Sequence, residues 1–318
     1  MSVRRLLIPS LVVLAPLGAT VALVAGRDRL QRRLVRAGVA RARAAAGLEP
    51  RETAVDGHAM AWLERPGPGP TVALVHGFNG GKDGWLRYAE HVPPDWHLVV
   101  PDLPGHGESG VNPSTDYDPP ALAHTLLAWL DIVAPGRVHL AGSSLGGELA
   151  TRVALDHPDR IASLALFNPA GVHPPEPSDM DRLADAEDYV LIPTTRAELD
   201  RLYAHVFVEP PDLPVVARTV FAAEAAARAP FMRGLLAHVG ANRDALRDRI
   251  GDLAVPTLLL WGDCDRVLHP SSAQVWAEAL PPGTLHVLAG VGHAPMLEAP
   301  AETARLHAAL VADAVGAA

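Results

Sequence analysis

The sequence predicts an α/β fold, in which a mostly parallel sheet is covered by helices on both faces. Short, continuously apolar runs at residues 71–75 and 161–167 have the composition of strands buried on both sides. Segments of helical length alternate with such runs along the chain, which is the order of repeated strand–helix–strand units. With 318 residues and a hydrophobic fraction of 49 %, the chain is long enough for one large domain with an insertion.

We expect the core of this domain to comprise residues 51–172 and 251–318. A hairpin should come first, because two strand-like segments, 52–55 and 58–64, flank Asp56-Gly57, a pair that favours a tight turn. Further strands are expected at residues 71–75, 97–100, 138–141, 161–167, 256–260 and 284–288, and helices at residues 121–133 and 145–156.

Residues 173–250 interrupt the alternation after the sixth strand. Prolines punctuate this segment, and short helices are expected between them at residues 196–205 and 215–228. Because the sheet resumes afterwards, we predict that the segment is a helical cap inserted over the functional site. The alternative is a second packing domain that has no part in binding.

An almost uncharged stretch, residues 6–26, lies near the amino terminus. As a helix it would be about 31 Å long, enough to cross the hydrocarbon core of a bilayer. We therefore predict that residues 1–26 form a transmembrane anchor. The alternative is a cleaved signal peptide, which usually has a shorter apolar core and a small-residue cleavage site.

Residues 27–50 are expected to form a basic juxtamembrane helix, which ends near Gly47. It would either be a solvated connecting helix or lie on anionic lipid headgroups. Loops rich in arginine stay in the cytoplasm, so we predict a membrane-anchored protein whose C-terminal domain is cytoplasmic; export is the alternative. The arginines that follow the apolar stretch are Arg27, Arg29, Arg32, Arg33 and Arg36.

Charge and composition argue against several classes of partner. The formal net charge is −9 and the isoelectric point about 5.9, so nothing indicates nucleic acid. Cys264 is the only cysteine, so no intrachain disulfide can form. The sequence has no Cys/His cluster with zinc spacing and no glycine-rich phosphate loop, so we expect no metal and no cofactor. The oligomeric state is left open.

The motif that organises the chain is Gly142-Ser-Ser-Leu-Gly146, which fits G-x-S-x-G. It lies between the expected strand at 138–141 and the expected helix at 145–156, which is the context of a nucleophile elbow. Side chains at Gly142 and Gly146 would collide with neighbouring backbone in such a turn. We therefore predict that Ser144 is a nucleophile held in a strained conformation.

A serine nucleophile needs a base and a group that orients the base, and in folds with this elbow the chain order is serine, acid, histidine. His293 ends a Gly-x-Gly-His turn after the last expected strand, and we assign it as the base. Two acids, Asp263 and Asp265, follow the strand before it. We favour Asp265 as the orienting acid, with Asp263 as the alternative. Both loops follow carboxyl ends of strands, where sites in parallel sheets gather.

The tetrahedral intermediate of acyl transfer needs two N–H donors. We expect one to be the backbone N–H of Leu145, directly after the nucleophile, and the other to be that of Phe78, in the loop after the strand at 71–75. His76 and Gly77 are expected to shape this loop, and His106 is expected to be structural.

Across residues 52–314 the chain resembles the α/β-hydrolase fold serine hydrolases. Within that group it resembles the membrane-anchored monoacylglycerol lipase branch (α/β-hydrolase domain-containing protein 6) and related bacterial lipases. The resemblance implies the triad Ser144, Asp265 and His293. The branch often carries Met where this chain has Leu145, a departure that leaves the main-chain donor in place. The motifs that carry the resemblance are His76-Gly-Phe, Lys82-Asp-Gly-Trp85, Asp102-Leu-Pro-Gly-His-Gly107, Gly142-Ser-Ser-Leu-Gly-Gly147, Asn168-Pro-Ala-Gly171, Leu191-Ile-Pro-Thr-Thr195, Trp261-Gly-x-x-Asp265 and Gly292-His293.

The expected activity is hydrolysis of lipid-like carboxylic esters, as by a monoacylglycerol lipase or carboxylesterase. A hydrolase that cleaves C–C bonds in ring-cleavage products uses the same triad and is the first alternative. A non-catalytic binding protein on the same scaffold would be expected to lack a triad member, and none is missing here. Haloalkane dehalogenases and epoxide hydrolases place Asp at the position of Ser144, which argues against them.

Overall fold

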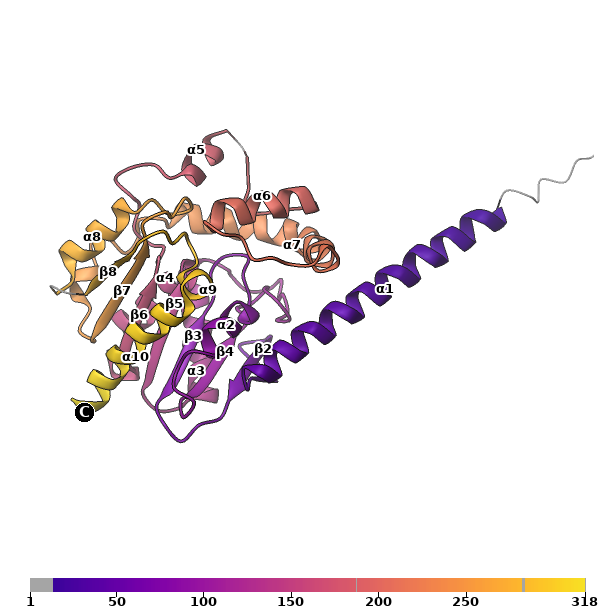
Figure 1. The fold of residues 1–318 in the computed structure, drawn as a ribbon. Coiled ribbons are helices and arrows are strands. Elements are labelled where there is room, and N and C mark those ends of the chain that lie inside the picture. Colours follow the sequence, from indigo (N-terminus) through magenta and orange to yellow (C-terminus); the bar gives the residue numbers. More distant parts are fainter. Residues whose placement is uncertain (1–13, 187, 282–283, 318) are drawn as a thin grey trace, which may run out of the picture.

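The computed structural model describes residues 14–186, 188–281 and 284–317. Its centre is an eight-stranded sheet with the order β1-β2-β4-β3-β5-β6-β7-β8 (Figure 1). The pairs β1–β2 and β2–β4 are antiparallel and the other neighbours are parallel, so the predicted α/β fold with a mostly parallel sheet is confirmed. The strands are β1 (Glu49–Val55), β2 (His58–Arg65), β3 (Thr71–Val75), β4 (His97–Pro101), β5 (Val138–Ser143), β6 (Ile161–Phe167), β7 (Thr257–Gly262) and β8 (Leu285–Leu288).

The hairpin between β1 and β2 turns where the sequence predicts. Asp56 and Gly57 have φ values of 48° and 78°, and a two-residue turn with both φ values positive matches the twist of the flanking strands. Val55 pairs with His58 directly across this turn. Strand β1 begins at Glu49, three residues before the expected start, because the pairing with β2 continues to Glu64.

Helices cover both faces of the sheet, and the alternation along β3 separates the two cores. Ala73 and Val75 belong to a buried cluster with helices α3 (Pro119–Val133), α4 (Leu145–Asp156) and α8 (Ser271–Ala279). Val72 and Leu74 point to the opposite cluster, which includes α2 (Leu86–Ala89), α9 (Pro295–Glu298) and α10 (Pro300–Gly316). This arrangement follows from a strand period of two residues. Short 3₁₀ helices lie at η1 (Lys82–Trp85), η2 (Pro158–Arg160) and η3 (Ile250–Asp252).

Three α-helices of the described residues lie between β6 and β7, in the segment where the alternation of strands and helices stops. They are α5 (Asp179–Asp185), α6 (Arg196–Val206) and α7 (Val215–Ala241). The sequence pattern predicted an end near residue 228, but α7 continues through Pro230. A proline inside a helix costs about 3 kcal/mol, and burial of Ala229, Met232 and Leu235 in the core around α3 and α4 offsets that cost.

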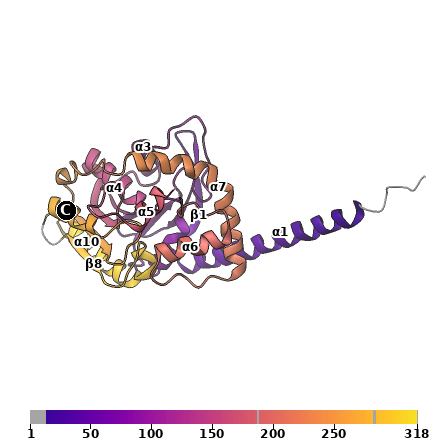
Figure 2. The ribbon, with the colours of Figure 1, turned by 90° about the horizontal axis from the view of Figure 1, so that it is seen from above.

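Helix α1 (Leu14–Ala45) is continuous across the two segments that the sequence suggested, and its amino-terminal part extends away from the sheet (Figures 1 and 2). Gly47, with a φ of 68°, follows its end. Residues 1–13, which include much of the predicted anchor, lie outside the described residues. Within residues 14–186, 188–281 and 284–317, no helix has the length and apolarity needed to span a bilayer.

Candidate active site

Ser144 lies in a strained turn between β5 and α4. Its φ of 54° and ψ of −121° are rare for a residue with a side chain and cost on the order of 1–3 kcal/mol. A Cβ at Gly142 would lie 2.2 Å from the carbonyl oxygen of Gly146, and a Cβ at Gly146 would lie 2.3 Å from that of Val75. Glycine at both positions therefore lets the chain make this turn against β3.

Asp265 and His293 lie in the loops after β7 and β8, and they are in contact. The Nδ1 atom of His293 lies 2.8 Å from Oδ2 of Asp265, and Asp265 is only 3 % exposed. The other carboxylate oxygen, Oδ1, accepts hydrogen bonds from the N–H groups of Val267 (2.8 Å) and Leu268 (3.0 Å). These donors hold the carboxylate in place, and the carboxylate orients the imidazole with its Nε2 free to accept a proton.

Asp263, the alternative acid, has a different role in the structure. It is exposed, and its Oδ1 accepts a hydrogen bond of 2.7 Å from the N–H of Gly290. That contact closes the turn after β8. Among the described residues, no hydrogen bond joins Asp263 to His293, nor does one join Ser144 Oγ to His293. Nucleophile–base contacts are often long in ligand-free sites and shorten when substrate is bound.

Two residues to which the sequence analysis assigned no role hold the carboxylate of Asp265 and the loop of His293. Asn168 is fully buried, and its Nδ2 donates to Oδ2 of Asp265 at 2.6 Å. Glu298 accepts from the N–H of Gly292, next to the histidine, at 3.0 Å, and from the N–H of Val208 at 2.7 Å. The available signal for Asn168 was its place directly after a buried strand, at the same edge of the sheet as Ser144.

The loop after β3 packs against Ser144. A Cβ at Gly77 would lie 2.9 Å from the Cβ of Ser144, so this loop can approach the serine only with glycine there. Phe78 follows and is partly buried against the apolar core. Asn79 has a φ of 52° and donates from Nδ2 to the carbonyl oxygen of Leu191 at 2.9 Å. The loop is thereby tied to the segment between β6 and β7.

His76 and His106 are buried and neutral. The Nε2 atom of His76 accepts from the N–H of Leu103 at 2.9 Å, and its Nδ1 donates to the carbonyl oxygen of Gly77 at 2.8 Å. Burial lowers the pKa of His76 to about 4 and that of His106 to about 3. Because both nitrogens of His76 are engaged with backbone, this ring supports the loop.

The residue that follows Ser144 belongs to the apolar core on one face of the sheet. Leu145, directly after Ser144, is buried in one cluster with Leu103, Ile192 and Met232. Helix α7 supplies Met232, and its Phe231 lies against the turn after β4, where a Cβ at Gly105 would be 2.3 Å from the ring. A pocket of about 280 Å³ is lined by Ile192, by other residues between 188 and 201, and by Arg233. Neither Ser144 nor His293 lines that pocket.

The chain is similar to several known hydrolases. Lipase 3 of Moraxella sp. (strain TA144) is 30 % identical over 257 residues, which cover 79 % of this chain and 81 % of that protein. The monoacylglycerol lipase abhd6-A of Xenopus laevis is 30 % identical over 259 residues, covering 76 % of this chain and 75 % of the relative.

Among solved structures, a membrane phospholipase A described as a bacterial virulence factor superposes with a TM-score of 0.87 at 32 % identity, covering 95 % of this chain and 98 % of that one. The sequence model of the alpha/beta hydrolase family matches residues 72–306, which include Ser144, Asp265 and His293. The chain therefore belongs to the alpha/beta hydrolase family.

Proposed function

We propose that this serine ester hydrolase acts on lipid-like carboxylic esters, with Ser144, His293 and Asp265 as its catalytic triad. One observation carries the proposal: a strained serine follows β5, and a buried Asp–His pair lies in the loops after β7 and β8, at the same end of the sheet. Family membership and the lipase relatives establish the serine ester hydrolase class. The proposal concerns the residues and the kind of ester.

In the proposed mechanism, Ser144 Oγ attacks the ester carbonyl while Nε2 of His293 takes the hydroxyl proton. Asp265 holds the Nδ1–H tautomer and stabilises the imidazolium that forms. The N–H groups of Phe78 and Leu145 donate hydrogen bonds to the oxyanion. His293 then protonates the leaving alcohol and, after it departs, activates the water that hydrolyses the acyl-enzyme.

The substrate class is inferred from the apolar side chains of the proposed cap. The segment 173–250 is proposed to act as a cap on a core of residues 51–172 and 251–318, because α7 contributes Met232 and Leu235 to the same apolar core as Leu145. An acyl chain gains about 0.8 kcal/mol for each CH₂ group it buries. Lipases and a monoacylglycerol lipase among the relatives support a lipid ester as the substrate.

Membrane attachment through the N-terminal segment is the second part of the proposal. The apolar stretch 6–26 precedes the arginines of α1, and relatives include a membrane phospholipase A. Each arginine near an anionic leaflet would contribute about 1 kcal/mol to attraction. The arginine-rich flank favours a cytoplasmic domain, whereas export remains the competing topology. Protease treatment of intact cells separates the two, because only an exported domain is digested without lysis.

The substrate proposal is tested with hydrolysis rates for p-nitrophenyl esters of rising chain length, beside monoacylglycerols and triacylglycerols. We expect medium-chain monoesters to be hydrolysed faster than acetate, and the Ser144→Ala variant to be inactive on all of them. A preference for acetate, or activity only on charged dienoates, would contradict the lipid-ester assignment.

A further inference from the structure

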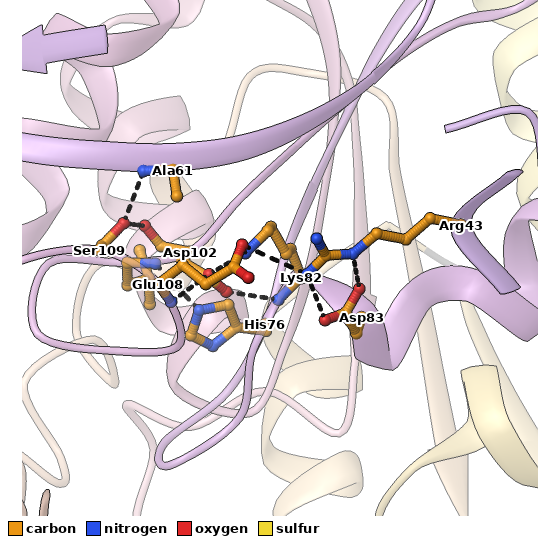
Figure 3. A network of polar contacts seen from close by, with 9 residues as sticks. Arg43, Ala61, His76, Lys82, Asp83, Asp102, Glu108 and Ser109 are labelled. Carbon is orange, nitrogen blue, oxygen red and sulfur yellow. Dashed lines mark hydrogen bonds and ion pairs between the residues drawn. The ribbon is translucent and has the colours of Figure 1, made fainter. Parts of the chain in front are cut away.

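Lys82, the only lysine in the chain, is almost completely buried beside the loop that carries Phe78. It is 1 % exposed, and its Nζ is paired with Oδ2 of Asp102 and, at 2.7 Å, with Oε2 of Glu108 (Figure 3). Taking an ammonium group out of water costs several kcal/mol unless it is paired and hydrogen-bonded. Since well-packed apolar residues often replace such buried pairs without loss of stability, stability alone is a weak reason for this one.

Asp102 joins two loops, which follow the carboxyl ends of the neighbouring strands β3 and β4. Its Oδ1 accepts from the N–H of Lys82 at 2.7 Å, after β3, and its Oδ2 accepts from the N–H of Glu108 at 2.8 Å, after β4. A Cβ at Gly107 would lie 2.2 Å from the carboxylate, so the second loop closes tightly around it. The carboxylate therefore fixes the main chain at Lys82 directly.

The segment between His76 and Lys82 is held at both ends by neighbouring residues of one loop. At its start, the ring of His76 accepts from the N–H of Leu103 at 2.9 Å, and at its end the N–H of Lys82 donates to Asp102. Phe78 lies between these two anchors. The position of its N–H, the proposed oxyanion donor, is therefore set between these two anchors.

Arg43 extends this network to the end of helix α1. Its guanidinium binds Asp83 through two hydrogen bonds of 2.7 and 2.8 Å and reaches Oε2 of Glu108 at 3.3 Å (Figure 3). Its side chain is only 12 % exposed, and hydrogen bonding to Asp83 raises the pKa of Arg43. Burial alone would raise the pKa of Glu108, but the hydrogen bond and charge of Lys82, together with Arg43, outweigh burial and lower it. Glu108 is therefore ionised between two cations.

We propose that Lys82 and Arg43 are positioning residues, which hold the loop of Phe78 so that the docking of helix α1 sets the geometry of the oxyanion donor. The chain of contacts runs from Arg43 through Asp83 and Glu108 to Lys82 and Asp102. This inference rests on the proposed role of Phe78. An N–H that is misplaced by a loosened loop weakens stabilisation of the transition state, so kcat should fall while KM changes little.

The experiment uses the full-length protein and a soluble p-nitrophenyl ester. Loss of one oxyanion donor costs about 10²–10³ in kcat, and we expect Lys82→Met to approach that loss. Arg43→Gln should lower kcat about tenfold, with KM within about twofold, because it loosens only the outer part of the network. Arg41→Gln removes the same charge from an exposed position of the same helix and should leave both constants unchanged.

A double-mutant cycle separates positioning from a general effect of charge. Arg43→Gln and Asp83→Asn break the same contact, and Arg43→Gln also removes the contact with Glu108, so the double variant should lose no more kcat than Arg43→Gln alone. Additive losses in the double variant would overturn the positioning role. So would an unchanged kcat in the Arg43 variants, measured on protein of which a separate sample shows full labelling of Ser144 by a fluorophosphonate probe, so that Ser144 is intact. If Lys82→Met fails to fold, the Arg43 and Asp83 variants decide the matter. A wild-type protein that hydrolyses no ester would instead refute the proposed function.

Discussion

The two sides of the candidate site are held in physically different ways. On the side of β7 and β8, the carboxylate of Asp265 is satisfied by two backbone N–H groups, by the amide of Asn168 and by His293. On the side of β3 and β4, Asp102 is held by a buried ammonium group as well as by backbone N–H groups. The first side uses backbone, amide and imidazole donors from nearby loops, whereas the second uses a buried ammonium group.

This difference teaches where each side is vulnerable. Hydrogen bonds from backbone to a carboxylate are lost only if the loop itself moves, so the acid–histidine side should be sensitive mainly to changes at its own residues. Buried charges depend on every partner, because removing one leaves another uncompensated. The side of β3 and β4, which holds the proposed oxyanion donor Phe78, should therefore respond to substitutions as distant in sequence as Arg43.

The largest effect that distinguishes the two acids is expected at Asp265. Asp265→Asn should lower kcat by about 10⁴, because an amide in that place favours the wrong tautomer of His293, as in serine proteases. Asp263→Asn is the matched control, and it should cost far less because Asp263 only closes the turn at Gly290. Steady-state kinetics of both variants test this, and a larger loss at Asp263 would reverse the assignment.

A smaller effect is expected at Asn168, which donates a hydrogen bond to the carboxylate of Asp265. Asn168→Gly keeps a backbone that tolerates the φ of 46° but removes the donor to Asp265, and hydrogen bonds to charged groups contribute about 1.5–3 kcal/mol. We expect kcat to fall by about 10- to 100-fold.

The matched control is Asp56→Gly, which makes the same backbone change at a φ of 48° in the distant hairpin and should leave kcat unaltered. Equal effects of the two variants would mean that backbone freedom, and not the amide, was responsible.

Mild acid should act on stability through buried histidines, two of which support the side of β3 and β4. The folded-state pKa values of His76, His106 and His307 are lowered by burial from 6.5 to about 4, 3 and 3. The unfolded chain therefore takes up protons first as the pH falls below about 6.5, and each histidine removes about 1.4 kcal/mol of stability per pH unit. Stability is retained above that pH and lost below it.

Urea unfolding at pH 7, 6 and 5 measures this loss. The free energy of unfolding should fall steadily below pH 6.5. His106→Gln should make this fall less steep by the contribution of about one proton. A profile that stays flat from pH 7 to pH 5 would show that these rings titrate normally in the folded protein.

Local patterns were sufficient for most of the sheet and for the chain order of the proposed triad. The strand at 161–167 and the helix at 145–156 were predicted with the bounds that the structure has, because apolar runs and the G-x-S-x-G turn are local signals. The end of α7 was predicted wrongly at residue 228, since Pro230 is a local stop signal and the burial of Met232 and Leu235 is a tertiary effect.

The supporting contacts of the site were beyond the sequence because they join distant residues. Asn168 binds Asp265 across 97 positions and Arg43 binds Asp83 across 40. Nothing in composition or spacing pairs such residues. Lys82 stood out in the sequence as the only lysine, but its burial and its two acidic partners are properties of the folded loops.

The central claim is that Ser144 is the nucleophile, and covalent labelling tests it most directly. The wild-type protein is treated with a fluorophosphonate probe, and the adduct is located by mass spectrometry of peptides. A single adduct on Ser144 is predicted, lost in Ser144→Ala and retained in Ser143→Ala, together with a fall of about 10⁶ in kcat for Ser144→Ala. An adduct on Ser143, or labelling that survives Ser144→Ala, would contradict the account.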